Sequence, residues 1–207
     1  NKVSNLLRVP LIGGDLIKTS QKSVTVSVCG ETKKNSHLSR SGAKHNQNIY
    51  LTGELGLARS GLEEIKKNCS KNIYRKKNVK RFIFPKLRLE ISNSISQFAS
   101  SCIDVSDGFI ADLEKILIPS NQGAVINLDK IPRVDNSSLE DFTFGDDLEL
   151  IFTADKKYHK KVMKLSDSSG INISLLGQTK KNSGIKYLLN NDEVLFPRKK
   201  GWNHGKK

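Results

Sequence analysis

The stretch SSCIDVSDGFIADL, residues 100–113, places two carboxylates and one hydroxyl close together. Asp104, Ser106 and Asp107 stand where an apolar, strand-like segment gives way to a helix-like one. Helix capping explains part of this pattern, because Ser106 is a typical N-cap and Asp107 a typical first-turn acid. Capping does not explain Asp104, since a carboxylate at the end of an apolar strand loses hydration unless a cation lies nearby. The alternative interpretation is a site for a metal ion and phosphate.

Two further Gly/Asp junctions border apolar segments, at Gly14-Asp15 and at Gly145-Asp146-Asp147. Turn chemistry can explain each of them, since Gly and Asp are among the commonest turn residues. If the three junctions meet at one end of a sheet, their carboxylates suit Mg²⁺, which protein carboxylates usually bind together with substrate phosphates. The glycines would let phosphate oxygens approach the backbone closely.

Arg40, in the segment SRSGAK, would add a planar fork of donors suited to phosphate. The sequence has no P-loop, no Gly-x-Gly-x-x-Gly pattern and no kinase catalytic-loop signature. A nucleotide bound at these turns would therefore be held by bridging metal ions.

The charge of the chain favours anionic partners. With 35 Lys and Arg against 21 Asp and Glu, the formal net charge is +14. The only dense basic block is residues 66–81, and aromatic residues make up 6% of the chain. A single-strand-binding surface interleaves aromatic and basic side chains, so we do not expect nucleic acid to be the main partner.

Several features bear on where the protein acts. No apolar run reaches the roughly 20 residues that cross a bilayer, and no signal-peptide pattern is present. The three cysteines show no metal-binding spacing, which favours reduced thiols and a cytoplasmic protein. The chain starts without Met, in what reads as the middle of an element, so we expect a piece of a longer protein.

Hydrophobic periodicity predicts interleaved strands and helices, which favours an α/β or α+β fold. Residues 31–39 are polar and aperiodic, so we expect a domain boundary there, with domains at 1–33 and 34–207. The expected strands are 5–12, 23–29, 48–52, 102–105, 123–132, 145–154 and 171–176, with a hairpin around 190–191. The expected helices lie near 55–67, from 85 to 98, from 107 to 117 and near 156–166.

Six motifs occur in an order and spacing that carry a family resemblance: LIGGD, RSGAK…IYLTGELG, SSCIDVSDGFIADL, GAVINLDKIP, GDDLELIFT and KGWNH. Together they resemble the thiamine-monophosphate kinases of the aminoimidazole-ribonucleotide-synthetase-like superfamily. The resemblance implies a two-domain α/β fold whose first domain is largely missing here. It also implies a cytoplasmic homodimer that transfers the terminal phosphoryl group of ATP to thiamine monophosphate, using several Mg²⁺ ions.

The resemblance also implies roles for individual residues. Gly14, Asp15, Arg40 and Ser106 match positions that bind ATP. No residue is assigned as a catalytic base, because the attacking oxygen belongs to a phosphate monoester that is already largely ionised at neutral pH. The four histidines, at positions 37, 45, 159 and 204, are given no role in catalysis.

The resemblance also implies which residues bind the metal ions and the substrate. Asp15, Asp104 and Asp107 match Mg²⁺ ligands, while Asp146 and Trp202 match the positions that hold thiamine monophosphate. Asp146 would offer the thiazolium ring a countercharge, and Trp202 would offer it an aromatic face.

Three departures from the family pattern stand out: Leu16-Ile17 in place of two threonines, His45-Asn46-Gln47 in place of Pro-Gly-Asp, and Gly205 in place of Phe. The first third of the family's sequence, with its further metal-binding loops, is not represented, so we expect this chain alone to be impaired or inactive. Two alternatives stay open: a superfamily member that acts on another phosphate acceptor, and a non-catalytic basic fragment that binds nucleotides or nucleic acid.

Overall fold

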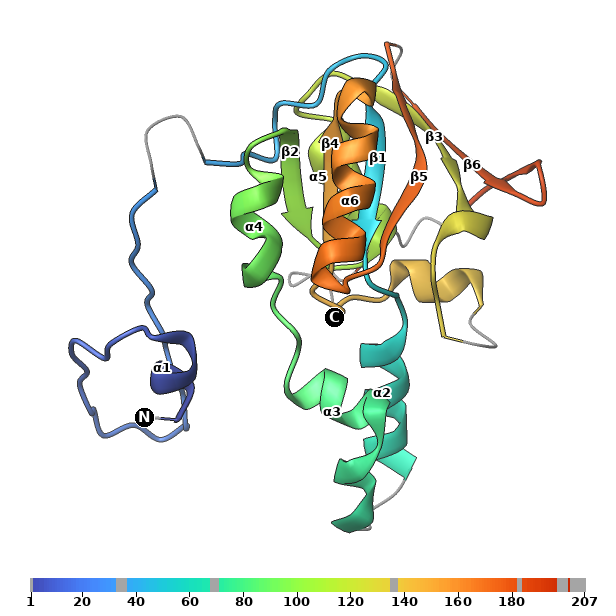
Figure 1. Ribbon diagram of the computed structural model, residues 1–207. Coiled ribbons are helices and arrows are strands. Elements are labelled where there is room, and N and C mark those ends of the chain that lie inside the picture. Colours follow the sequence, from blue (N-terminus) through green and yellow to red (C-terminus); the bar gives the residue numbers. More distant parts are fainter. Residues whose placement is uncertain are drawn as a thin grey trace. The chain divides into compact units, whose positions relative to one another are not determined.

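The structure, a computed structural model, describes residues 2–32, 37–67, 71–134, 138–181, 184–196 and 201. Internal contacts divide the chain into two units, residues 1–32 and 33–207. The first unit contains one short helix, α1 (Lys2–Leu7), and its other described residues have no regular secondary structure (Figure 1).

Two strand predictions in the first unit are wrong. Residues 5–12 begin within α1, and residues 23–29 have no regular secondary structure and are not part of a sheet. Val24, Val26 and Val28, whose alternation suggested a strand, are all exposed. A strand needs a neighbour for its backbone hydrogen bonds, and no described residue pairs with either segment.

The second unit is built on a seven-stranded sheet, of order β2-β4-β1-β5-β3-β6-β7. The strands are β1 (Asn48–Thr52), β2 (Ala99–Asp104), β3 (Gly123–Asn127), β4 (Leu150–Ala154), β5 (Ile173–Lys180), β6 (Ile185–Leu189) and β7 (Asp192–Val194). All neighbours pair antiparallel except β3 and β6, which are parallel.

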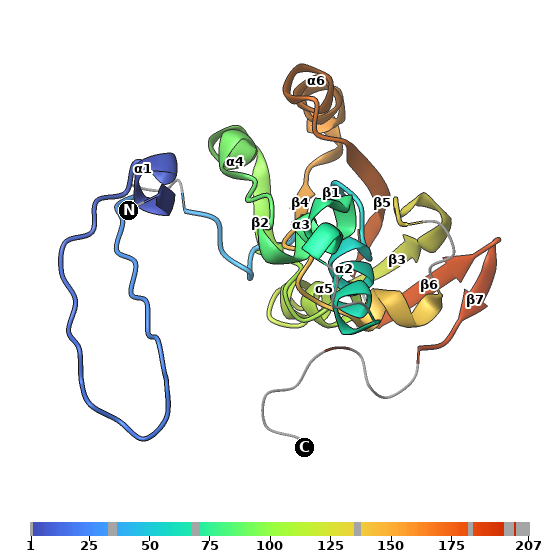
Figure 2. The ribbon, with the colours of Figure 1, turned by 90° about the horizontal axis from the view of Figure 1, so that it is seen from below.

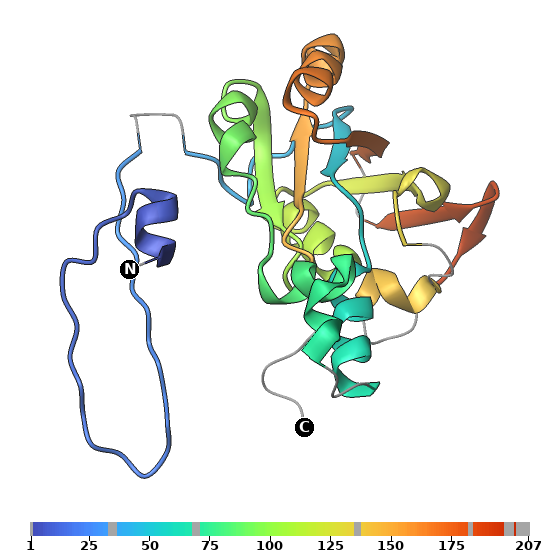
Figure 3. The same ribbon diagram turned by 60° about the horizontal axis from the view of Figure 1, so that its bottom comes forward.

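The main helices of this unit are α2 (Leu57–Lys67), α3 (Lys77–Ile83), α4 (Leu89–Ile95), α5 (Phe109–Leu117) and α6 (His159–Ser169). Helix α5 covers one face of the sheet, while α4 and α6 cover the other (Figure 2). Helices α2 and α3 lie side by side at one end of the sheet, as Figure 3 shows in teal and green. The predicted α/β class is confirmed by this arrangement.

Strand β1 shows how the sequence builds two cores on one sheet. Successive side chains of a strand point to opposite faces. Ile49 and Leu51 pack in the cluster that contains α5, whereas Tyr50 packs in the cluster that contains α4 and α6. All three are fully buried, so the central strand is apolar on both faces.

Several boundaries differ from the sequence predictions. Helix α3 begins within the basic block, ends two residues after it, and was not predicted. Strand β4 begins at Leu150 rather than 145, and β3 ends at Asn127 before a short 3₁₀ turn, Leu128–Lys130. The acidic residues before β4 therefore lie in a loop, because their backbone groups bond to other turns rather than to the sheet.

Candidate functional site

A buried carboxylate shapes the turn between β2 and α5. Asp112 is fully buried, and its Oδ2 accepts the backbone N–H groups of Ser106 (2.9 Å), Asp107 (2.9 Å) and Gly108 (3.1 Å). The N-cap of α5 is Gly108, at φ 120°, and no side chain caps it. The predicted capping by Ser106 and Asp107 is therefore wrong, because Asp112 reaches back from the first turn of the helix and takes these donors.

A lysine lies against the acids of this turn. Lys115 Nζ donates to Asp107 and, at 2.6 Å, to Asp112 Oδ1. Although partial burial opposes it, hydrogen bonding to these carboxylates raises the pKa of Lys115. Asp104, half-buried, is the last residue of β2 and pairs in register with Leu150 of β4. The turn thus presents two carboxylates and one ammonium group at the end of β2.

Arg40 and Lys115 line the same hollow, which has a volume of about 820 Å³ and is otherwise formed by residues 39, 41, 111, 114, 118 and 119. The segment that carries Arg40 is held on both sides. The carbonyl of Ser39 accepts the N–H of Cys102 at 3.0 Å, and the hydroxyl of Ser120 accepts the N–H groups of residues 42 and 43. Two cationic groups, one exposed and one in contact with Asp107, therefore face one space.

The loop before β4 is bonded directly to the Asp104–Asp107 turn. Asp146 N donates to the Ser106 carbonyl (3.1 Å), and Leu148 N donates to the Val105 carbonyl (2.9 Å). A Cβ atom at Gly145 would lie 1.9 Å from the Ser106 carbonyl oxygen, so the approach requires glycine. Asp146 is exposed and adopts φ 68°, an unusual conformation for a residue with a side chain. The structure thus brings two of the three acidic junctions together.

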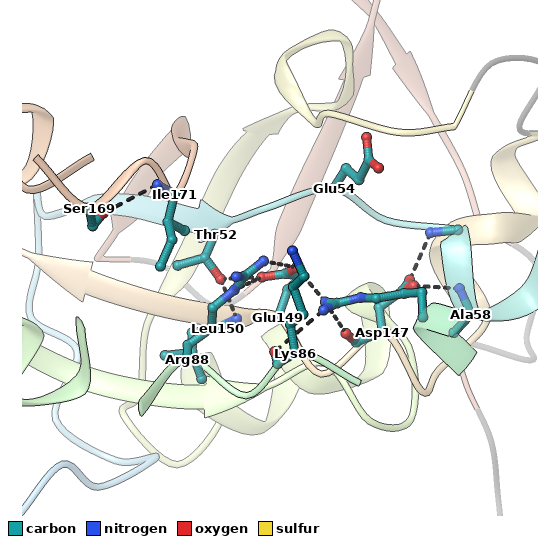
Figure 4. A network of polar contacts seen from close by, with 12 residues as sticks. Thr52, Glu54, Ala58, Lys86, Arg88, Asp147, Glu149, Leu150, Ser169 and Ile171 are labelled. Carbon is teal, nitrogen blue, oxygen red and sulfur yellow. Dashed lines mark hydrogen bonds and ion pairs between the residues drawn. The ribbon is translucent and has the colours of Figure 1, made fainter. Parts of the chain in front are cut away.

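Glu149 anchors the far end of this loop, and sequence reasoning missed it. It is 1% exposed, and its carboxylate accepts hydrogen bonds from Arg81 (2.5 Å), Arg88 Nε (2.7 Å) and the Thr52 hydroxyl (2.6 Å). Figure 4 shows Glu149 between Thr52 and Arg88. Two guanidinium groups thus neutralise one buried charge, which is the condition under which a buried carboxylate is tolerated.

Asp147 ties the same loop to the start of α2. Its carboxylate accepts the N–H groups of Gly56 (2.8 Å) and Ala58 (3.0 Å), the second of which Figure 4 labels. Its carbonyl accepts from Arg81 at 2.7 Å. Burial raises the pKa of Asp147 to about 6, although these hydrogen bonds and Arg81 act in the opposite direction. Asp147 therefore holds the backbone on the C-terminal side of Asp146 in place.

The other predicted site residues belong to the first unit or lie outside the described residues. Gly14 and the exposed Asp15 belong to the first unit. Trp202 lies outside the described residues, but Gly201 is described, and a Cβ atom there would lie 2.6 Å from the Asp107 carbonyl oxygen. Among the histidines, His159 bonds the buried Tyr50 hydroxyl through Nδ1 at 3.0 Å, in a partly buried contact.

The site's donors suit a hard cation. Within the described part of the chain, no three His, Cys, Asp or Glu side chains form a group that could hold a metal ion. Asp104 and Asp107 are two carboxylates at one turn, and Mg²⁺ is typically held by one or two carboxylates with phosphate oxygens completing the shell. These two residues thus offer carboxylate oxygens of the kind that Mg²⁺ binds, and Asp107 also accepts a hydrogen bond from Lys115.

A match to a known family identifies the class of proteins to which this architecture and these acidic turns belong. Residues 45–189 match the family described as AIR synthase related protein, C-terminal domain. The chain therefore belongs to this family.

No helix in the described ranges is both long and apolar enough to cross a membrane.

Two curated proteins that are similar in sequence to this chain are thiamine-monophosphate kinases. Those of Buchnera aphidicola subsp. Acyrthosiphon pisum and Leptospira interrogans are 37% and 32% identical, over 98% and 91% of this chain. The chain spans 66% and 62% of their lengths. The predicted resemblance is confirmed by these relatives.

Solved structures show the same fold. The thiamine-monophosphate kinase of Stenotrophomonas maltophilia aligns with a TM-score of 0.68 at 24% identity, over 75% of this chain and 54% of that one. AaThiL complexed with AMPPCP and TMP aligns with a TM-score of 0.66 at 21% identity, over 81% and 54%.

Proposed function

We propose that the complete protein is a thiamine-monophosphate kinase, which transfers the terminal phosphoryl group of ATP to thiamine monophosphate and forms thiamine diphosphate. The observation that carries the proposal is the direct bonding of the Asp104–Asp107 turn to the Asp146 loop, in a chain similar to named thiamine-monophosphate kinases. AaThiL, which has this fold, was solved with AMPPCP and TMP.

In this proposal the two turns have complementary tasks. Asp104 and Asp107 would hold Mg²⁺, and Arg40 and Ser106 would contact ATP. For the first unit, considered by itself, we propose that Asp15 is a further metal ligand and that Gly14 and Asp15 are ATP-binding residues. When bound, Mg²⁺ neutralises charge on the phosphate oxygens. Arg40 and Lys115 line one hollow and add positive charge beside the same turn.

The acceptor is held at the neighbouring loop, where Asp146 supplies a countercharge to the thiazolium ring and Trp202 an aromatic face. An oxygen of the acceptor's phosphate attacks the terminal phosphorus of ATP, and the bond to the ADP oxygen breaks. No side chain need remove a proton, because the second pKa of a phosphate monoester is about 6. Catalysis then consists of positioning and charge neutralisation.

We also propose that the complete protein is a cytoplasmic homodimer. The exposed apolar side chains of the first unit, which include Leu16, Val24 and Val26, support a partner surface there. Size-exclusion chromatography with light scattering on the complete protein should give twice the protomer mass.

The function is tested by following thiamine diphosphate formation from thiamine monophosphate and Mg·ATP. The chain should be compared with a restored version that is extended to the full length of these relatives. We expect product from the restored version and little or none from the chain alone. If both proteins fold and neither forms product, the kinase proposal is wrong, and other phosphate acceptors should be screened.

Replacing Asp107 with Asn in the complete protein tests the metal site. Loss of one ligand should remove several kcal/mol of transition-state stabilisation, which lowers turnover by roughly 100-fold or more. Asp167→Asn, an exposed change on α6, is the matched control and should leave turnover unchanged. Normal turnover in Asp107→Asn would exclude this residue from the metal site.

A further inference from the structure

A second hollow lies between the α2–α3 pair and the end of the sheet, with a volume of about 810 Å³. This is within the usual range for small-molecule sites. Its wall includes two acidic residues, Glu54 and Glu149, and six cationic ones: Arg75, Lys77, Lys80, Arg81, Lys86 and Arg88. The hollow therefore has an excess of four positive charges and favours an anion.

The acids of the wall are already neutralised. Glu149 is bonded to Arg81 and Arg88, and Glu54 accepts a hydrogen bond from Lys77 at 2.8 Å. Figure 4 shows that the Glu54 side chain points away from the Glu149 network. Neither carboxylate therefore leaves uncompensated negative charge to repel an anionic ligand.

Three cations of the wall are available to a ligand. Arg75, Lys80 and Lys86 are exposed, and within the described ranges none of their side chains forms a hydrogen bond or ion pair. They come from the 3₁₀ helix Lys71–Arg75, from α3 and from the segment after α3. Groups from three segments thus converge on one space, which is how a polyanion is held without a metal ion.

Two aromatic rings complete the wall. Tyr74 and Phe84 line the hollow and are 55% and 75% exposed. Both rings are therefore open to solvent within one hollow. They offer flat apolar faces on which the ring of a nucleobase can stack.

We propose that this hollow binds a small phosphate ester that carries an aromatic ring, of the nucleoside polyphosphate class, and binds it without a metal ion. The proposal goes beyond the kinase function. At the acidic turns Asp104 and Asp107 can bind phosphate only through Mg²⁺, with Arg40 and Ser106 as additional contacts, whereas Arg75, Lys80 and Lys86 bind the phosphates directly and Tyr74 or Phe84 stacks on the base. ATP binding measured without a metal ion therefore reports on this hollow rather than on the acidic turns.

The test is a calorimetric titration of ATP into the chain in the presence of EDTA. We expect one ATP per chain, and at least tenfold weaker binding to the double variant Lys80→Gln/Lys86→Gln. The matched control, Lys160→Gln/Lys164→Gln, removes the same charge from exposed positions on α6 and should bind ATP within twofold of the unchanged chain. Equal weakening in both double variants would overturn the proposal, because general charge would then explain binding.

Two further arms identify the site and its ligand. Arg40→Gln, which removes the exposed cation of the hollow beside the acidic turns, should leave ATP binding in EDTA unchanged, and a loss of binding in this variant would overturn the proposal by placing the ligand at those turns. Phe84→Leu should weaken ATP binding at least threefold but leave tripolyphosphate binding unchanged.

A single-stranded oligonucleotide of thymidines separates a small ligand from nucleic acid. We expect it to bind more weakly than ATP at physiological salt. Tighter binding of the oligonucleotide than of ATP, lost in Lys80→Gln/Lys86→Gln, would overturn the assignment to a small ligand and favour a nucleic-acid surface. A failure of the kinase assay leaves these binding results unaffected, since they use no Mg²⁺.

Discussion

Glu149 is a single residue on which the candidate site depends without forming part of it. Its carboxylate accepts from Arg81, Arg88 and Thr52, and its own carbonyl accepts the N–H of Val105 at 2.7 Å. It therefore joins the α3 region, the end of β1 and the Asp104–Asp107 turn. The Glu149 side chain neutralises the two guanidinium groups, and its backbone carbonyl positions Val105.

Replacing Glu149 with Gln should destabilise the chain by roughly 3 kcal/mol, because two buried guanidinium groups lose their countercharge. Urea denaturation measures this difference. Glu193→Gln is the control, since Glu193 pairs with Lys186 at the surface and should change stability by less than about 1 kcal/mol. Equal stabilities for the two variants would show that the buried network contributes no more than a surface pair.

Asp147 should make stability depend on pH. Burial raises the pKa of its carboxyl group from 3.8 to about 6, so the folded chain holds this proton more tightly than the unfolded chain. The stability that the folded chain gains from this tighter proton binding is fully present below about pH 4. It is lost as pH rises through 6, and the free energy of unfolding falls by roughly 3 kcal/mol over this range. Asp147→Asn cannot titrate there. The stability of the unchanged chain relative to this variant should therefore fall between pH 4 and 7, and parallel urea profiles would contradict the prediction.

At the scale of elements, the site is a junction between two turns rather than the product of one motif. The β2–α5 turn and the loop before β4 exchange backbone hydrogen bonds at Val105, Ser106, Asp146 and Leu148. Helix α5 holds the first turn through Asp112, and α2 holds the second through Asp147. Each turn is therefore positioned by a helix as well as by its neighbour.

Gly145→Ala should separate these turns, because the added Cβ atom would lie 1.9 Å from the Ser106 carbonyl oxygen. We expect a loss of about 1–3 kcal/mol in unfolding free energy, and a fall in kinase turnover in the complete protein. At Gly13 an added Cβ atom meets nothing within 4 Å, so Gly13→Ala is the control. Wild-type stability for Gly145→Ala would mean that the turns can move apart without cost.

At the scale of the whole molecule, the two units differ in what they bury. The second unit contains both apolar clusters, whereas the large apolar residues of the first unit, such as Ile12 and Leu16, are exposed. Stability in water comes mainly from burial of apolar surface. The second unit should therefore account for most of the chain's stability.

Removing residues 1–32 should accordingly change the unfolding free energy by less than about 1 kcal/mol, which is the size expected for changes at exposed positions. Urea denaturation of the chain and of residues 33–207 provides the comparison. A loss of several kcal/mol on truncation would contradict the prediction, because it would require the apolar side chains of the first unit to be covered in solution.

The sequence by itself determined the features that depend on neighbours along the chain. The continuous apolar run Ile49-Tyr50-Leu51 places apolar side chains on both faces of β1, and the apolar spacing of 109–117 predicts the buried face of α5. The motifs that carry the family resemblance are also local, which is why they could be recognised. Local spacing likewise indicated that Asp104 and Asp107 lie at a strand–helix junction.

Only the tertiary structure decided which groups meet across the chain. Glu149 bonds Arg81 and Arg88, which lie 68 and 61 positions away, and no pattern near Glu149 points to either. Asp112, rather than Ser106, takes the donors of the β2–α5 turn, and residues 23–29 form no strand despite their alternation. In each case the deciding interaction is a hydrogen bond whose partner is set by the folded backbone, and the free energy of burying a charge or an N–H group depends on that partner.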